Sequence, residues 1–156
     1  MKPNQILLTQ KDFNKLKNEV KKARESNNKT IIFSSEDDEL NRKVIEKLEI
    51  DILLLNLSNR KDFQKQRDSG FNQVLAKAMK KADIQLGINL DEIVEETNPK
   101  KKAEILARIK QNILLCNKNK VKMKFIAKNE KNNRNIYDLK ALGIVLGMPT
   151  WMTKEL

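Results

Sequence analysis

Asp51-Ile52-Leu53-Leu54-Leu55 carries the clearest structural signal in this chain of 156 residues. Four apolar side chains follow one another, so a strand formed here is hydrophobic on both faces. Strands of that kind are typical of parallel sheets with helices packed on either side. The segment therefore predicts a parallel α/β architecture.

Short apolar runs and longer periodic segments alternate on both sides of this strand. Further strands are expected at 5–8, 30–33, 84–89 and 121–127. Helices are expected after Thr9, which would cap the first of them, after Ser34-Ser35, over about 71–82, from Asn98-Pro99 to about 117, and after Asn135. Asn98 and Pro99 suit a helix cap and first helical position, and Gly147 before Pro149 suits a helix end. Residues 56–70 are the least regular and are expected to form a loop. Five strand–helix units predict a parallel (βα) repeat, too short for a complete eight-stranded barrel.

Length and composition set further limits. The chain is long enough for one domain, spanning 1–156. It contains no histidine, which excludes Ser–His and Cys–His nucleophile pairs and His-ligated zinc. The single cysteine, Cys116, can form neither an internal disulfide nor a thiolate metal site, which fits a reducing cytosol. Because no apolar run approaches the ~20 residues of a membrane span, the expectation is a cytoplasmic protein without a membrane segment.

Positive charge is concentrated in two segments. The chain has 32 Lys and Arg against 21 Asp and Glu, a net charge of +11. Residues 1–35 have a net charge of +5 and residues 98–134 a net charge of +10. Attraction to a polyanion grows with the number of phosphates neutralised, so clustered charge favours nucleic acid or an anionic surface. The alternative is a lysine-rich composition with no binding role.

Carboxylates near the predicted strand ends are the candidates for metal chemistry: Asp37, Asp38, Asp51, Asp91 and Glu92. Paired carboxylates are suitable Mg²⁺ ligands. The acidic residues at 36–39 equally suit the positive end of a helix, and those at 91–96 a solvated connection. With four glycines, the chain has no glycine-rich phosphate-binding motif. Local motifs therefore predict no catalytic residue and no metal ligand.

Basic residues are more informative. Lys100, Lys101 and Lys102 begin the longest predicted helix, where the helix dipole favours acidic side chains. Arg108 lies seven residues after Lys101, on the same side and away from the apolar stripe. This pattern predicts an exposed phosphate-binding face, and ordinary solvation is the alternative. Aromatic residues make up 4% of the chain, so a stacking platform for single-stranded bases is not expected.

Four sequence blocks add a more specific signal. The central block is Asp68-Ser69-Gly70-Phe71-Asn72-Gln73-Val74-Leu75-Ala76-Lys77 followed by Ile84-Gln85-Leu86-Gly87-Ile88-Asn89-Leu90. The others are Asn41-Arg42 with Glu46 and 51–53, the helix segment 105–112, and 138–143 with 146–148. Together they resemble archaeal ribonuclease P protein component 3, the Rpp30-type family, most strongly over 30–149.

The resemblance implies a barrel of the polymerase-and-histidinol-phosphatase (PHP) type that lacks that superfamily's metal-binding histidines. Family members carry an additional N-terminal segment, so an N-terminally shortened, partial TIM-like barrel of about five strands is expected. The implied function is that of a ribonuclease P subunit, binding and stabilising the catalytic RNA during 5′ maturation of precursor tRNA. The implied partners are ribonuclease P RNA, precursor tRNA and a Pop5-type subunit in a hetero-oligomer. Mg²⁺ would belong to the RNA, with no cofactor on this chain.

The candidates for RNA contact are basic side chains in or near the matched blocks. Arg42 stands in an otherwise acidic helix and is able to hold a phosphate bidentately. Lys77, Arg108 and Lys110 belong to matched blocks, whereas charge density alone selects Lys101, Lys102 and Arg134. Two alternatives remain: a carboxylate- and Mg²⁺-dependent PHP-like phosphoesterase, and a non-catalytic structural domain whose charge is only compositional.

Overall fold

One parallel sheet organises the computed structural model, which describes residues 4–26 and 30–156. Its strands are β1 (Gln5–Leu8), β2 (Thr30–Phe33), β3 (Ile52–Leu55), β4 (Gln85–Asn89) and β5 (Met123–Ile126). They lie in chain order, each hydrogen-bonded in parallel to the next. This is the strand order of a TIM-like barrel, so the predicted parallel (βα) repeat and partial barrel are confirmed.

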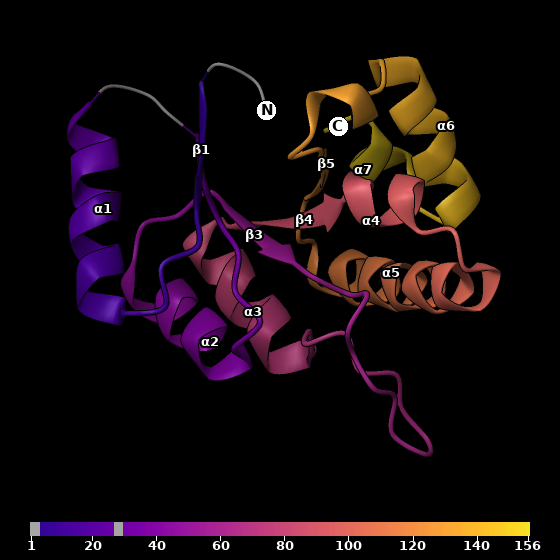
Figure 1. Ribbon diagram of the computed structural model, residues 1–156, viewed down its shortest axis with the longest axis horizontal. Coiled ribbons are helices and arrows are strands. Elements are labelled where there is room, and N and C mark those ends of the chain that lie inside the picture. Colours follow the sequence, from indigo (N-terminus) through magenta and orange to yellow (C-terminus); the bar gives the residue numbers. More distant parts are fainter. Residues whose placement is uncertain (1–3, 27–29) are drawn as a thin grey trace.

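Helices connect and follow the strands: α1 (Phe13–Glu25), α2 (Asp38–Lys47), α3 (Gln73–Ala82), α4 (Leu90–Glu95), α5 (Pro99–Asn119), the 3-10 helix η1 (Glu130–Asn132), α6 (Ile136–Leu146) and α7 (Thr150–Thr153). In the middle of the molecule, α3 packs between α2 and α5 (Figure 1). No helix within the described ranges is both long and apolar enough to cross a membrane.

The core has two parts, one on each face of the sheet. Leu53 and Leu55 belong to the larger cluster, which the helices complete. Ile52 and Leu54 belong to a smaller cluster with Ile32 and Ile126. All four side chains of β3 are almost fully buried, as predicted for a strand that is apolar on both faces. Alternation of side chains along the strand thus lets one short segment supply both clusters.

Helix ends follow local capping chemistry, with two corrections. Asn98 accepts hydrogen bonds from the first turn of α5 and Pro99 is its first residue, as predicted. The expectation that Thr9 caps the first helix is wrong, because Asp12 accepts a hydrogen bond from the amide of Lys15 at 2.9 Å. Aspartate caps at least as well as threonine and stands immediately before the first apolar residue.

The second correction concerns the segment after β4. A solvated connection was expected at 91–96, but residues 90–95 form α4, capped by Asn89. Asp91 and Glu92 occupy its first turn, where the helix dipole favours acidic side chains. Six residues are too few to show a helical period in the sequence, which is why this element was missed.

Candidate nucleic-acid interface

The longest connection in the structure joins β3 to α3 and spans residues 56–72, which we call the β3–α3 loop. No helix or strand forms within it, as expected for the irregular stretch 56–70. Figure 1 shows it extending from the body of the molecule below α5. Two arginines, Arg60 and Arg108, hold the base of this loop.

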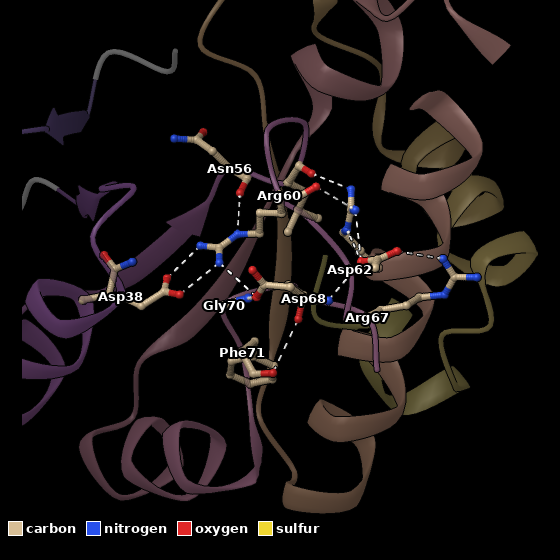
Figure 2. A network of polar contacts seen from close by, with 12 residues as sticks. Asp38, Asn56, Arg60, Asp62, Arg67, Asp68, Gly70 and Phe71 are labelled. Atoms are coloured by element: carbon tan, nitrogen blue, oxygen red, sulfur yellow. Dashed lines mark hydrogen bonds and ion pairs between the residues drawn. The ribbon is translucent and has the colours of Figure 1, made fainter. Parts of the chain in front are cut away.

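Arg60 ties the loop to the start of α2. Its guanidinium contacts both carboxylate oxygens of Asp38, at 2.7 Å and 3.0 Å, and Asp68 Oδ1 at 3.2 Å. Its Nε donates to the carbonyl oxygen of Asn56 at 3.0 Å (Figure 2). The side chain is only 10% exposed, and its bond to Asp38 raises the pKa of Arg60 despite that burial. The guanidinium therefore stays charged and joins three separate parts of the backbone.

Arg108 fixes the loop from the side of α5. Its guanidinium donates to the carbonyl oxygens of Leu57 at 2.9 Å and Arg60 at 3.0 Å. Two further bonds reach Asp62 Oδ1, at 3.0 Å and 3.1 Å. The residue is 1% exposed, so the prediction that Arg108 lies on an exposed face with Lys101 is wrong. Helical spacing placed it away from the apolar stripe, but the loop covers that side of the helix and satisfies its charge.

Asp62 is the carboxylate partner of Arg108. Burial opposes its ionisation, but hydrogen bonds from the amide of Asp68 and from Arg108 outweigh this and lower the pKa of Asp62. Its second oxygen lies 3.4 Å from Arg67. The carboxylate is thus ionised at neutral pH, and its oxygens accept hydrogen bonds that hold the loop together.

The return of the loop depends on Gly70. Its φ of +66° lies in the left-handed region that favours glycine, and its amide donates to Asp68 at 3.0 Å. A Cβ added here would overlap the guanidinium of Arg60, so the arginine packs directly against the glycine backbone. One residue earlier, the buried Ser69 hydroxyl donates to Asn112 on α5 at 2.6 Å. Residues from the matched blocks 68–77 and 105–112 therefore meet at the loop base.

A groove lies between this loop, α2 and the start of α3. It encloses about 310 Å³. Its lining consists of Asp38, Arg42, Phe63 and Val74 together with residues 66–72 and Leu75. The groove thus brings the Arg42 side chain next to the central matched block.

The Asn41-Arg42 pair divides into a structural and an exposed residue. Asn41 is fully buried and donates to the carbonyl oxygen of Ser35 at 3.2 Å. The Arg42 side chain is 64% exposed and forms an ion pair with Glu46 on the next turn, at 3.0 Å. Arg67, which lines the same groove, is 48% exposed and pairs with Asp62 at the longer distance of 3.4 Å. Within residues 4–26 and 30–156, each guanidinium keeps nitrogens without a carboxylate partner, and these are able to bind a phosphate, which planar arginine binds well.

The other predicted cations lie on separate elements. Lys77 is exposed on α3, and Lys110 is exposed on α5. The residue after Lys110 is Gln111, whose side-chain amide donates to the carbonyl oxygen of Arg67 at 3.3 Å. In the first turn of α5, Lys101 is exposed and Lys102 is half-buried. None of these four lysines forms an ion pair within the part of the chain that the structure describes.

Arg134 lies away from the groove. It is exposed between η1 and α6 and donates to the nearby carbonyl oxygens of Lys131 and Asn133. With Lys124 it lines a second cavity, of about 160 Å³, which also includes Gln5. The structure therefore groups Arg42 with the loop but does not gather all seven predicted residues on one surface.

The carboxylates considered as Mg²⁺ ligands all accept hydrogen bonds from the protein. Asp37 caps α2, Asp38 pairs with Arg60, and Asp51 accepts from the amide of Ile31 at 2.7 Å. Asp91 and Glu92 accept from backbone amides of the β5–η1 and β3–α3 connections, respectively. Within 4–26 and 30–156, no group of three or more His, Cys, Asp or Glu residues has an arrangement suited to a metal ion. These carboxylates organise helix ends and loops.

Comparison with known proteins places the chain in a family. The family model described as RNase P subunit p30 matches residues 4–156. In fold, the chain is similar to a chain in the cryo-EM structure of archaeal ribonuclease P with mature tRNA, with a TM-score of 0.76 and 22% sequence identity. That similarity covers 96% of this chain and 62% of the other. None of the curated proteins compared with the sequence matches it. The resemblance noted in four sequence blocks is confirmed, and the chain belongs to the ribonuclease P subunit p30 family.

Proposed function

We propose that this chain is a protein subunit of ribonuclease P that binds and stabilises the catalytic RNA during 5′ maturation of precursor tRNA. The observation that carries the proposal is the family match over residues 4–156. The fold likeness to a chain of archaeal ribonuclease P supports it. In this role the RNA performs the hydrolysis and holds the Mg²⁺, and the protein contributes positioning and charge neutralisation.

The groove supplies the best site for RNA phosphates. Arg42 and Arg67 line it from α2 and from the loop, and each guanidinium has nitrogens that contact no carboxylate among the described residues. Lys110 extends the positive surface along α5. Such contacts fix an RNA backbone in place without reading its sequence, which suits a subunit that stabilises a folded RNA.

We further propose that a Pop5-type subunit completes the assembly in the cytoplasm. Within the residues that the structure describes, the sheet ends at β5 on one side, and an edge strand leaves backbone N–H and C=O groups without partners from a neighbouring strand. A second protein chain is able to cover such an edge. The net charge of +11 opposes association of two copies of this chain and favours a hetero-oligomer on RNA.

Reconstitution tests this function. Ribonuclease P RNA from the same source is combined with its other protein subunits, with and without this chain, and cleavage of precursor tRNA is measured. We expect the chain to increase cleavage and to bind the RNA with a strong dependence on salt concentration. Cleavage by the protein alone, abolished by a chelator, would instead support the phosphoesterase. An absence of salt-dependent RNA binding would support the structural domain.

A further inference from the structure

The tip of the β3–α3 loop presents an aromatic ring to solvent. Phe63 is 71% exposed. Its amide donates to the carbonyl oxygen of Gln66 at 2.9 Å, and the amide of Gln66 donates back at 3.3 Å. These two bonds close a tight turn around Gln64 and Lys65. Phe63 therefore has a defined backbone position, although its side chain contributes little to the core.

The loop base holds this tip in place. Arg108 bonds to Leu57, Arg60 and Asp62, so its last contact is with the residue immediately before Phe63. Burying a guanidinium is unfavourable unless hydrogen bonds satisfy it, and in the described part of the chain those of Arg108 reach Leu57, Arg60 and Asp62, all in the loop. Arg108 is buried, yet the segment that it holds in place carries an exposed phenylalanine that adds little to the core. Stabilisation of the fold alone therefore does not explain this arrangement. The arrangement suits a binding element, because ordering the tip beforehand lowers the entropy lost on binding.

The charge around the ring indicates the kind of ligand. Residues 61–67 contain three cations, Lys61, Lys65 and Arg67, and one anion, Asp62, which Arg108 already neutralises. Neither lysine forms an ion pair among the residues that the structure describes. An exposed ring flanked in the chain by two lysines without ion pairs among the described residues, and by Arg67 with its long contact to Asp62, suits a nucleotide. The base of a nucleotide stacks on aromatic side chains, and its phosphates attract the cations.

We propose that Phe63 stacks on an unpaired RNA base while Lys61, Lys65 and Arg67 hold the adjacent phosphates. Phe63 and Arg67 both line the groove that contains Arg42, so the RNA strand continues from the loop tip into the groove. This inference rests on the proposed function and deepens it, because it names unpaired RNA as the ligand of the tip. The low aromatic content led us to expect no stacking platform for single-stranded bases, whereas this proposal needs a single ring for one base.

The test compares two RNA probes bound by the full chain. One is a stem–loop with unpaired bases, and the other is a fully paired duplex of the same length. We expect Phe63→Ala to weaken stem–loop binding about tenfold, within the range for loss of one stacked base, and to leave duplex binding unchanged. The salt dependence should stay the same because no phosphate contact is removed. Phe63→Trp should restore binding, and Phe63→Leu should not.

Ile144→Ala provides the matched control, since Ile144 is an apolar side chain of similar exposure, 63%, on α6. This substitution should change neither the affinity for the stem–loop nor the affinity for the duplex. If wild type binds both RNAs and Phe63→Ala binds the stem–loop equally well, the stacking role is refuted while the proposed function stands. If Phe63→Ala keeps its RNA affinity but loses a Pop5-type subunit, the ring is a protein anchor and the RNA assignment is refuted. If wild type binds neither RNA, both proposals fail.

Discussion

The base and the tip of the β3–α3 loop use the same kinds of charged residue in opposite environments. At the base, the side chains of Arg60 and Arg108 are 10% and 2% exposed and bind carboxylates and carbonyl oxygens. Figure 2 shows the contacts of Arg60 with Asp38, Asn56 and Asp68. At the tip, Lys61 and Lys65 are exposed and have no carboxylate partner in the described part of the chain. Charge at the base determines the shape of the loop, whereas charge at the tip is available to a ligand.

This contrast predicts different consequences for mutation. Removing one partner of a buried, hydrogen-bonded ion pair leaves the other uncompensated and costs about 3–5 kcal/mol. An exposed cation usually contributes less than about 1 kcal/mol to folding, whatever its part in binding. Substitutions at the base should therefore act on stability, and substitutions on the groove and tip should act on RNA.

The largest effect is expected at Arg108. Replacing it with alanine removes a buried side chain and leaves two loop carbonyl oxygens without their donor, so the free energy of unfolding should fall by about 2–4 kcal/mol. Urea denaturation followed by circular dichroism measures this. Lys110→Ala, an exposed cation on the same helix, is the control and should cost less than about 0.5 kcal/mol. Equal stability of the two variants would mean that the base does not hold the loop.

The next largest effect is expected at Gly70, and a comparison with Gly147 distinguishes backbone strain from loss of the Arg60 contact. Gly70 and Gly147 both have positive φ, +66° and +98°, so alanine at either position should cost about 1–2 kcal/mol in strain. A Cβ at Gly147 meets no atom within 4 Å, whereas one at Gly70 displaces the Arg60 guanidinium. Gly70→Ala should therefore lower the free energy of unfolding by at least about 1 kcal/mol more than Gly147→Ala. Similar thermal unfolding curves would show that Arg60 readjusts freely.

Arg60 and Arg108 also show which features of the structure the sequence does not predict. The strands and the caps at Asn98 and Gly147 were predictable because their signals are local: apolar runs, a capping side chain, a glycine after a helix. The environment of Arg108 is set by partners 46 and 51 residues away, which helical periodicity does not report. The available clue was opposite charges interspersed at 60, 62, 67 and 68 in an apparently irregular stretch.

The exposed residues of the site were only partly predictable. Arg42 was selected because it belongs to the matched Asn41-Arg42 pair in a segment of net negative charge, and the structure places it beside the groove. Phe63 was missed because an isolated phenylalanine in a loop resembles a core residue in the sequence. Its exposure follows from the turn at 63–66, and that turn follows from contacts with α5 that are distant in the chain.

A smaller effect on stability should appear with pH through Asp62. Its pKa is lowered in the folded state, so its contribution is complete above the unfolded pKa of roughly 3.9 and is lost as the pH falls through the folded pKa. The free energy of unfolding of the wild type should exceed that of Asp62→Asn most at neutral pH. The difference between the two free energies should narrow below about pH 5. Urea midpoints at several pH values measure this. A difference that stays constant with pH would show that ionisation of Asp62 does not support the loop.

The smallest effect on folding, and a clear effect on binding, is expected at Arg42. Its single ion pair joins two largely exposed side chains one turn apart, which is worth about 0.3–0.5 kcal/mol. Arg42→Ala should therefore unfold almost as wild type does. Loss of one phosphate contact should lower the slope of log affinity against log salt by about one. Lys154→Ala, an exposed cation outside the groove and the loop, should leave that slope unchanged. If Arg42→Ala and Lys154→Ala change RNA binding equally, attraction follows net charge alone and the groove has no special part in it.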